Sequence, residues 1–210
     1  MNLSTKDLLW LGVLVLGFVH AFIVYEQLPD VIAVHWGFDG QADVFMSRAQ
    51  GAYSALLIGL LVAVALRLTL IHPSVAEVRE YMHGIVLMLA CVITGVNVMI
   101  LEVALGADIA PARAAWLIAG VVLVATCNPL GKLPINPVAG VRIPETTDDP
   151  EVWLQVNRFA GWLGTVLGLT MVIAYFAPID LHAVALVGLV VLFPIAIVIY
   201  ARRLSRQRSA

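Results

Sequence analysis

The sequence predicts an all-α polytopic membrane protein, a bundle of six transmembrane helices with both termini in the cytoplasm. Three observations lead to this prediction: the composition, six long apolar segments, and a one-sided distribution of basic residues. Hydrophobic residues make up 61% of the 210 residues and charged residues only 12%. Soluble domains carry about 25% charged residues, so most of this chain is suited to lipid rather than water. The length fits a single domain.

Six segments approach the roughly 20 apolar residues that a helix needs to cross about 30 Å of hydrocarbon. They cover residues 8–25, 51–71, 84–101, 114–130, 159–177 and 181–200. The first is a membrane helix rather than a signal peptide, because no small-x-small cleavage site follows it. The last two are joined around Pro178 and Asp180, where we expect a tight helical hairpin. Cys91 and Cys127 lie in apolar segments, where we expect buried, unpaired thiols.

Basic residues in the connections set the orientation, because cytoplasmic loops are enriched in Lys and Arg. With the N-terminus inside, the inner side holds ten basic residues: Lys6, Arg67, Arg79, Lys132, Arg142, Arg158, Arg202, Arg203, Arg206 and Arg208. The outer side holds only Arg48 and Arg113. Residues 128–161 are therefore predicted to be cytoplasmic, and residues 26–50 to be extracytoplasmic.

The chain divides into four regions on this basis. Residues 1–50 form the first transmembrane helix and the extracytoplasmic loop, and residues 51–130 form helices two to four. Residues 131–158 form a structured cytoplasmic loop, and residues 159–210 form helices five and six with a basic tail. The two halves share no visible repeat, whereas inverted-repeat transporters carry matched, broken helices in both halves.

Two interpretations of the extracytoplasmic loop fit the sequence. Gly37 and Gly40 disfavour a helix, and residues 31–36 are suited to a short strand. His35, Asp39 and Asp43 follow one another at intervals of four and offer ligands for a metal in an irregular loop.

In the alternative reading, Asp43 braces this loop, and His35 and Trp36 lie at the level of the lipid headgroups.

The cytoplasmic segment 128–161 contains five of the ten prolines, four acids and three bases. Asp148 or Asp149 is a candidate N-cap for a helix that begins near Pro150. Such a helix places Trp153, Asn157 and Gly161 on one face, because they are spaced four residues apart.

Arg142 carries a planar fork of donors that suits a carboxylate. Its candidate partners are Asp148, Asp149 and Glu151. Trp153 is expected to anchor the helix start at the membrane interface, and Asn157 with Arg158 to tie the loop to the bundle. The loop is either a self-braced connection or a binding surface.

Few polar residues lie at membrane depth. His20 is expected to be neutral and to pair with a hydroxyl or a backbone carbonyl, and Asn97 is the other polar group. Glu102 is placed at the outer end of the third span. Gly164 and Gly168 form a small-residue motif that favours close helix packing within the bundle.

Catalytic signatures are missing from the sequence. It contains no H-E-x-x-H, no G-x-S-x-G and no glycine-rich phosphate loop. We therefore expect no enzymatic activity, no cofactor and no direct binding of nucleic acid. A small transporter, or a metal-dependent membrane enzyme that uses the outer His and Asp residues, is the alternative.

Two patterns resemble the SdpI family of bacterial membrane proteins, including its DUF1648-type N-terminal region. The outer loop matches the pattern at Leu28, Pro29, His35, Gly40 and Asp43. The second signature of the family is matched at Asn128, Gly131, Asn136, Gly140, Arg142, Pro144, Thr146, Trp153, Asn157, Arg158 and Gly161. The chain departs from the family at Ile143, where a small polar residue is usual, and at Glu145, where an aromatic residue is usual.

The resemblance implies a multi-pass protein of the bacterial inner membrane that gives immunity to a secreted antimicrobial peptide toxin. It also implies signalling, by recruitment of a transcriptional repressor to the membrane. The partners would be membrane lipid, the peptide toxin and the repressor. The implied binding residues are Asn136, Arg142, Pro144, Thr146, Trp153, Asn157, Arg158, His35, Gly40 and Asp43.

The predicted topology can be tested by cysteine labelling in a variant that lacks Cys91 and Cys127. A membrane-impermeant thiol reagent added to intact cells should label Asp39→Cys and leave Thr147→Cys unlabelled. Permeabilised cells provide the control, because both positions should then react. Labelling of Thr147→Cys but not Asp39→Cys in intact cells would contradict the orientation.

Overall fold

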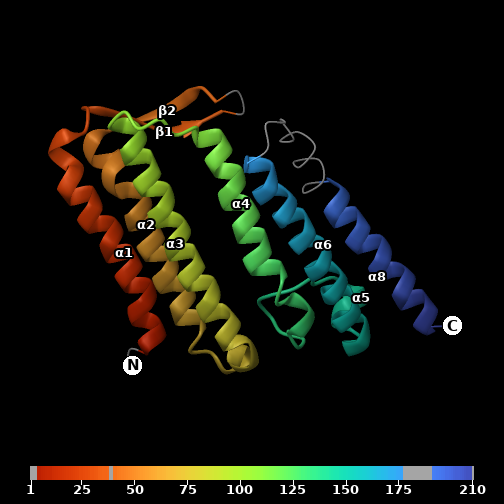
Figure 1. Ribbon diagram of the computed structural model, residues 1–210. Coiled ribbons are helices and arrows are strands. Elements are labelled where there is room, and N and C mark those ends of the chain that lie inside the picture. The colour runs from red at the N-terminus through yellow and green to blue at the C-terminus, as the bar shows by residue number, and fades with distance from the viewer. Residues whose placement is uncertain (1–3, 38–39, 177–190, 210) are drawn as a thin grey trace. The chain divides into compact units, whose positions relative to one another are not determined.

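The computed structural model describes residues 4–37, 40–176 and 191–209 of the chain, which form two compact units (Figure 1). Unit 1 comprises residues Met1–Ile71 and Met82–Ala115, and unit 2 comprises His72–Tyr81 and Trp116–Ala210. Helices dominate both units. Five helical segments of the described chain are long and apolar enough to cross a membrane: Thr5–Gln27, Arg48–Thr69, Pro73–Ala104, Arg113–Lys132 and Pro150–Phe176.

These five segments correspond to the first five predicted spans, so the prediction of a helical, multi-pass membrane protein is confirmed. The predicted sixth span lies partly outside the described residues. Its second half belongs to helix α8 (Phe193–Ser209). The hairpin predicted around Pro178 and Asp180 also lies outside the described residues.

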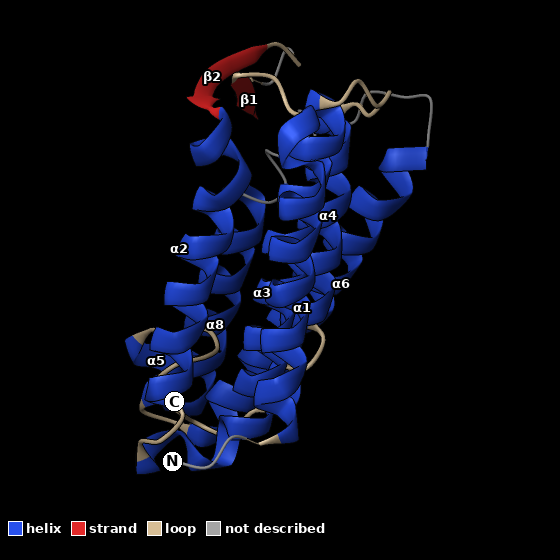
Figure 2. Cartoon of the chain, turned by 90° about the vertical axis from the view of Figure 1, so that its left-hand side faces the viewer, coloured by secondary structure: helices blue, strands red, loops and turns tan. Residues whose placement is uncertain are grey.

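Unit 1 consists of three helices and a β-hairpin. Its elements are α1 (Thr5–Val24), the short 3-10 helix η1 (Tyr25–Gln27), β1 (Val31–Trp36), β2 (Ala42–Ser47), α2 (Arg48–Thr69) and the larger part of α3 (Arg79–Ala104). The three helices run side by side, and the hairpin lies at the end where β2 leads into α2 (Figure 2). Helix α1 begins with a capping box, in which the Ser4 side chain and the Asp7 carboxylate satisfy each other's backbone N–H groups.

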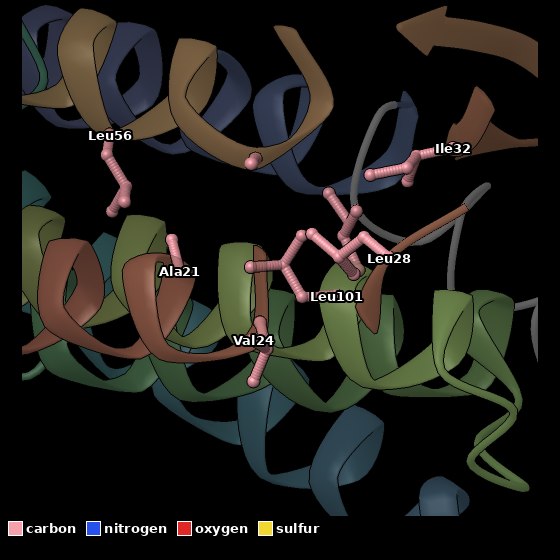
Figure 3. Close-up of a cluster of buried hydrophobic side chains, with 8 residues drawn as sticks. Ala21, Val24, Leu28, Ile32, Leu56 and Leu101 are labelled. Atoms are coloured by element: carbon pink, nitrogen blue, oxygen red, sulfur yellow. The ribbon is translucent and has the colours of Figure 1, made fainter. Parts of the chain in front are cut away.

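A buried apolar cluster joins the hairpin to the helices of unit 1 (Figure 3). It consists of Ala21, Val24, Leu28, Ile32, Ala52, Leu56, Ile100 and Leu101. Small residues allow the close packing. A Cβ added at Gly17 would lie 2.8 Å from a methyl group of Leu56, and one added at Gly51 would lie 3.0 Å from the Cβ of Ile32.

The strand predicted at residues 31–36 is confirmed, and β2 is an addition to the predicted all-helical architecture. The strands pair in antiparallel fashion, with Ile32 opposite Met46 and Ala33 opposite Phe45. Irregularities in the register lie on either side of His35. The strand β2 was missed because its residues do not alternate between apolar and polar, and its pairing with β1 depends on the turn between them.

An ion pair between α1 and α2 is buried at the other end of unit 1. Arg67 donates from Nε to Asp7 Oδ1 over 2.5 Å and from Nη2 to Asp7 Oδ2 over 3.0 Å. The Asp7 side chain is 0% exposed and the Arg67 side chain 15%. A fork of this kind satisfies both charges in a place where neither has much access to water.

The expected partner of His20 is corrected by the structure. His20 Nε2 lies 2.9 Å from Glu102 Oε1, so α1 is joined to α3 by a His–carboxylate pair rather than by a hydroxyl or a carbonyl. The sequence separation of the two residues concealed this pairing. The amide of Asn97 donates to the backbone oxygen of Ala52 over 3.1 Å and joins α3 to α2.

Unit 2 contains the rest of the chain. Its elements are η2 (Pro73–Val78), the larger part of α4 (Pro111–Cys127), η3 (Leu130–Lys132), α5 (Pro144–Thr147), α6 (Pro150–Phe176) and α8. Helix α8 packs on α6 through Val152, Val156, Ala160, Ile197 and Ala201.

Glycines bring α4 and α6 close together, as the small-residue motif predicts. A Cβ at Gly168 would lie 2.7 Å from the Gly120 oxygen, and one at Gly164 would overlap the side chain of Cys127. The motif is therefore used for packing within unit 2. Cys127 is buried as expected, but Cys91 is exposed, because an apolar helix also places part of its surface against lipid.

The buried ion pair leads to a stability prediction. Asp7→Asn keeps a side chain that caps α1 but leaves the Arg67 charge without its counter-ion, which we expect to cost about 3 kcal/mol. Thermal unfolding of the purified protein in detergent measures this loss. The control is Asp30→Asn, because Asp30 pairs with Arg48 but its side chain is 93% exposed.

The double variant Asp7→Leu, Arg67→Leu should be more stable than Asp7→Leu alone, since it removes both charges. If Asp7→Asn were as stable as the control Asp30→Asn, the ion pair between Asp7 and Arg67 would contribute little to stability.

Candidate functional site

Residues 131–149, from the second residue of η3 to the start of α6, fold into a compact structure that we call the cap. It ends at Asp149, which caps α6: the N–H groups of Glu151 and Val152 donate to Asp149 Oδ1 over 2.8 and 3.3 Å. These backbone donors, led by that of Glu151, lower the pKa of Asp149, and the Arg208 guanidinium acts in the same direction. The predicted N-cap and helix start are both confirmed.

Trp153 fixes the beginning of the cap to the first turn of α6. Its side chain is 1% exposed, and Nε1 donates to the Leu133 oxygen over 2.8 Å. The expectation that Trp153 anchors the helix at the membrane interface is therefore wrong. The indole is buried by the cap, because the chain after Leu133 folds back over it, and it holds the cap through the hydrogen bond to the Leu133 oxygen.

Asn157 fixes the middle of the cap one turn further along. Its amide nitrogen donates to the Trp153 oxygen over 2.9 Å, and its Oδ1 accepts the N–H of Val141 over 2.8 Å. Gly140 makes this approach possible. It has φ +116°, and a Cβ there would lie 2.8 Å from Asn157 Oδ1 and 2.9 Å from the Trp153 ring.

Thr146 closes the end of the cap. Its hydroxyl oxygen lies 2.7 Å from the Val141 oxygen and 2.9 Å from the Ile143 oxygen, so the hydroxyl can donate to either. It also accepts the N–H of Ile143 over 3.1 Å. The side chain is 0% exposed. Pro144 starts the one-turn helix α5 at a position where its missing N–H is not needed.

Asn136 closes the turn at the beginning of the cap. Its amide nitrogen donates to the oxygens of Pro134 and Ala139, and its Oδ1 accepts the N–H groups of Val138 and Ala139, all within 2.7–3.0 Å. One side chain thus satisfies the backbone of a segment that prolines keep out of regular structure.

The predicted role of Arg142 is corrected. Its Nη1 donates to the Pro137 oxygen over 2.5 Å, and among the described residues it pairs with no carboxylate. The nearby acids are engaged elsewhere: Glu145 Oε1 lies 3.4 Å from Arg202, and Asp149 Oδ2 lies 2.9 Å from Arg208.

Arg142 is exposed, and so is Pro144 on the same segment. Arg158 is also exposed, and its side chain makes no hydrogen bond or ion pair within the described chain. Its backbone, rather than its charge, contacts the cap: a Cβ at Gly131 would lie 2.9 Å from the Arg158 Cα.

The outer-loop residues form a separate group in unit 1. His35 Nδ1 lies 2.6 Å from Asp43 Oδ1, so Asp43 braces the hairpin as expected. Both side chains are more than half exposed. Gly40, with φ +77°, belongs to the connection between the strands. Asp39 lies outside the described residues, and the described residues contain no group of three candidate metal ligands.

Sequence reasoning missed the partners that α8 provides for the cap. The tail arginines were read only as a signal of topology, yet Arg202 and Arg208 pair with Glu145 and Asp149. It also missed the Leu133 oxygen as the acceptor for Trp153, because a backbone acceptor leaves no mark in a sequence.

Comparison with known families agrees with these two groups of residues. Residues 132–201 match the model of the SdpI/YfhL protein family. Residues 12–60 match a model described as a domain of unknown function, DUF1648. The resemblance to the SdpI family is confirmed. The SdpI/YfhL match contains the cap from Lys132 onward, all of α6 and part of α8, and the DUF1648 match contains the hairpin.

No curated protein and no solved structure matches the chain. The five apolar helices agree with a multi-pass membrane protein.

Gly140 provides a test of the cap. Gly140→Ala places a Cβ in a left-handed conformation, at a cost of about 1–2 kcal/mol, and drives it against Asn157 and Trp153. The control is Gly106→Ala, because Gly106 has φ +95° with open space around it. Limited proteolysis should cut residues 131–149 faster in Gly140→Ala than in either the control or the unchanged protein. Equal cleavage in both variants would show that the contact does not hold the cap.

Proposed function

We propose that the chain is an immunity protein of the bacterial inner membrane that protects the cell against a secreted antimicrobial peptide toxin. The proposal includes the orientation with both termini and the cap in the cytoplasm, and a second output in which the cap recruits a transcriptional repressor. The match to the SdpI/YfhL family over residues 132–201 supports it, as do the five helices suited to a membrane.

The observation that carries the proposal is the buried polar network of the cap. Asn136, Thr146, Trp153 and Asn157 are all less than 10% exposed, and their side chains bond to backbone atoms of the cap or of α6. A connection between two membrane helices has no need of such a network. A recognition surface gains from it, because a preorganised loop loses less conformational entropy when a partner binds.

Arg142 is the exposed residue of the cap that we propose binds a partner protein. The guanidinium has five N–H donors, and the described chain uses one of its nitrogens, for the Pro137 oxygen. The remaining donors suit a carboxylate on another protein. The acids of the cap do not compete for Arg142, since Arg202 and Arg208 hold Glu145 and Asp149.

The hairpin of unit 1 is the proposed toxin-facing surface. Residues 26–50 contain four acids, Glu26, Asp30, Asp39 and Asp43, and one arginine, Arg48. Val31 and Phe45 are 59% and 58% exposed. They lie on the same face, because Phe45 pairs with Ala33, two residues from Val31. An acidic surface with exposed apolar side chains suits a basic, amphipathic peptide.

We also infer that the chain is not an enzyme. The His35–Asp43 pair is exposed and lacks a described third ligand or a nucleophile beside it. Family membership points the same way.

Survival of a toxin-sensitive bacterial host that expresses the chain is the direct test, with membrane expression measured in parallel. Arg142→Ala should reach the membrane at a normal level, because the buried scaffold stays intact, but protection or signalling should fall, because the exposed guanidinium that contacts the partner is lost. Arg142→Lys should restore it only in part, because an ammonium group has no bidentate fork. Trp153→Ala should lower expression and protection together, because it empties a buried site at a cost of about 3–5 kcal/mol.

Arg203→Ala is the matched control, because Arg203 is exposed on α8 and its side chain makes no hydrogen bond or ion pair within the described chain. Arg158→Ala tests the remaining signature arginine of α6. Full protection by Arg142→Ala, Trp153→Ala and Arg158→Ala at normal expression would show that the cap is only a connection. No protection by the unchanged protein would refute the immunity function itself.

A further inference from the structure

Helix α6 carries an exposed apolar stripe along one face. Trp162, Val166, Leu169, Ile173 and Phe176 follow one another at intervals of four and three residues, and their exposed fractions are 63, 42, 48, 66 and 75%. This spacing is that of one helix face. In a helix that crosses a membrane, such a stripe is the surface that lipid covers.

Arg158 stands at the polar end of this stripe, four residues before Trp162 and therefore on the same face. The rise from Arg158 to Phe176 is about 27 Å, close to the roughly 30 Å thickness of the hydrocarbon. Tryptophan is enriched at the boundary of the bilayer, and long basic side chains extend to the headgroups. Arg158 is thus placed at headgroup level.

Lys132 brings a second positive charge to this place. The 3-10 helix η3 packs against α6 so closely that a Cβ at Gly131 would lie 2.9 Å from the Arg158 Cα. Lys132 is the next residue, and it is exposed. Neither the Lys132 side chain nor the Arg158 side chain forms a hydrogen bond or an ion pair with any residue that the structure describes.

None of the four acids nearest in sequence forms an ion pair with Lys132 or Arg158. Glu145 and Asp149 lie against Arg202 and Arg208. Glu151 accepts from Gln155 over 2.7 Å, and Asp148 accepts from the Thr147 hydroxyl over 3.5 Å. Two exposed cations beside the end of a lipid-facing stripe are therefore available to an anion from outside the described chain.

We propose that Lys132 and Arg158 bind the phosphate of an anionic phospholipid whose acyl chains lie along the apolar stripe of α6. A guanidinium binds phosphate in a bidentate manner, and an ammonium adds a point charge. Phosphatidylglycerol is favoured over phosphatidylcholine, because the choline ammonium would be repelled by the same two cations. The bound lipid would hold η3 against α6, at the point where the cap begins. This site does not depend on the immunity function.

The test uses the purified full-length protein in a neutral detergent. Phosphatidylglycerol and phosphatidylcholine with identical acyl chains are titrated, and bound lipid is counted by native mass spectrometry. Removing two charges that each interact with an anionic headgroup should weaken phosphatidylglycerol binding about thirtyfold. The variant is Lys132→Gln, Arg158→Gln. The matched control is Arg203→Gln, Arg206→Gln, which removes the same charge from exposed positions on α8.

The expected result is that the unchanged protein and the control bind phosphatidylglycerol in preference to phosphatidylcholine, and the variant does not. An equal loss in the control would overturn the proposal in favour of general attraction to the basic surface. Equal binding of both lipids by the unchanged protein would also overturn it. The same holds if inorganic phosphate, tested at the same concentrations, displaces the bound lipid, because the site would then take free anions. Thermal unfolding without added lipid checks that the variant is folded.

Discussion

The amide of Asn157 is the interaction on which the cap depends. It accepts the N–H of Val141 and donates to the oxygen of Trp153, so one buried side chain joins the loop to the helix. A buried amide needs partners for both of its polar ends, because an unsatisfied polar group costs about 1–3 kcal/mol. This need fixes the distance between the loop and α6, and Gly140 is required because any side chain there would occupy the same space.

In unit 1, pairs of ionisable side chains join neighbouring helices. Asp7 and Arg67 face each other between α1 and α2, and His20 faces Glu102 between α1 and α3. In an apolar bundle an ionisable group is tolerated when its partner comes from a neighbouring helix. Such pairs also select which helices are neighbours, since apolar contacts alone are not specific.

In unit 2, the basic side chains that stabilise the cap differ from those that we propose bind a partner. Arg202 and Arg208 pair with acids of the cap, whereas Arg142, Arg158 and Lys132 are exposed and pair with no carboxylate of the described chain. The polar side chains that bind the backbone inside the cap, those of Asn136, Thr146 and Asn157, are uncharged and buried, whereas its basic side chains Lys132 and Arg142 are exposed. Folding of the cap therefore leaves its positive groups available to a protein surface or to a lipid headgroup.

The sequence by itself determined the helical membrane class, the start of α6 at Pro150, the shared face of Trp153 and Asn157, and the use of Gly164 and Gly168 in packing. Each depends on periodicity, capping or composition, which are local properties of the chain. Only the tertiary structure decided that Trp153 is buried by the returning loop, that Arg142 meets the Pro137 oxygen, and that His20 pairs with Glu102. These contacts join residues whose approach depends on how the chain folds back, and a backbone oxygen or a distant carboxylate gives no local signal.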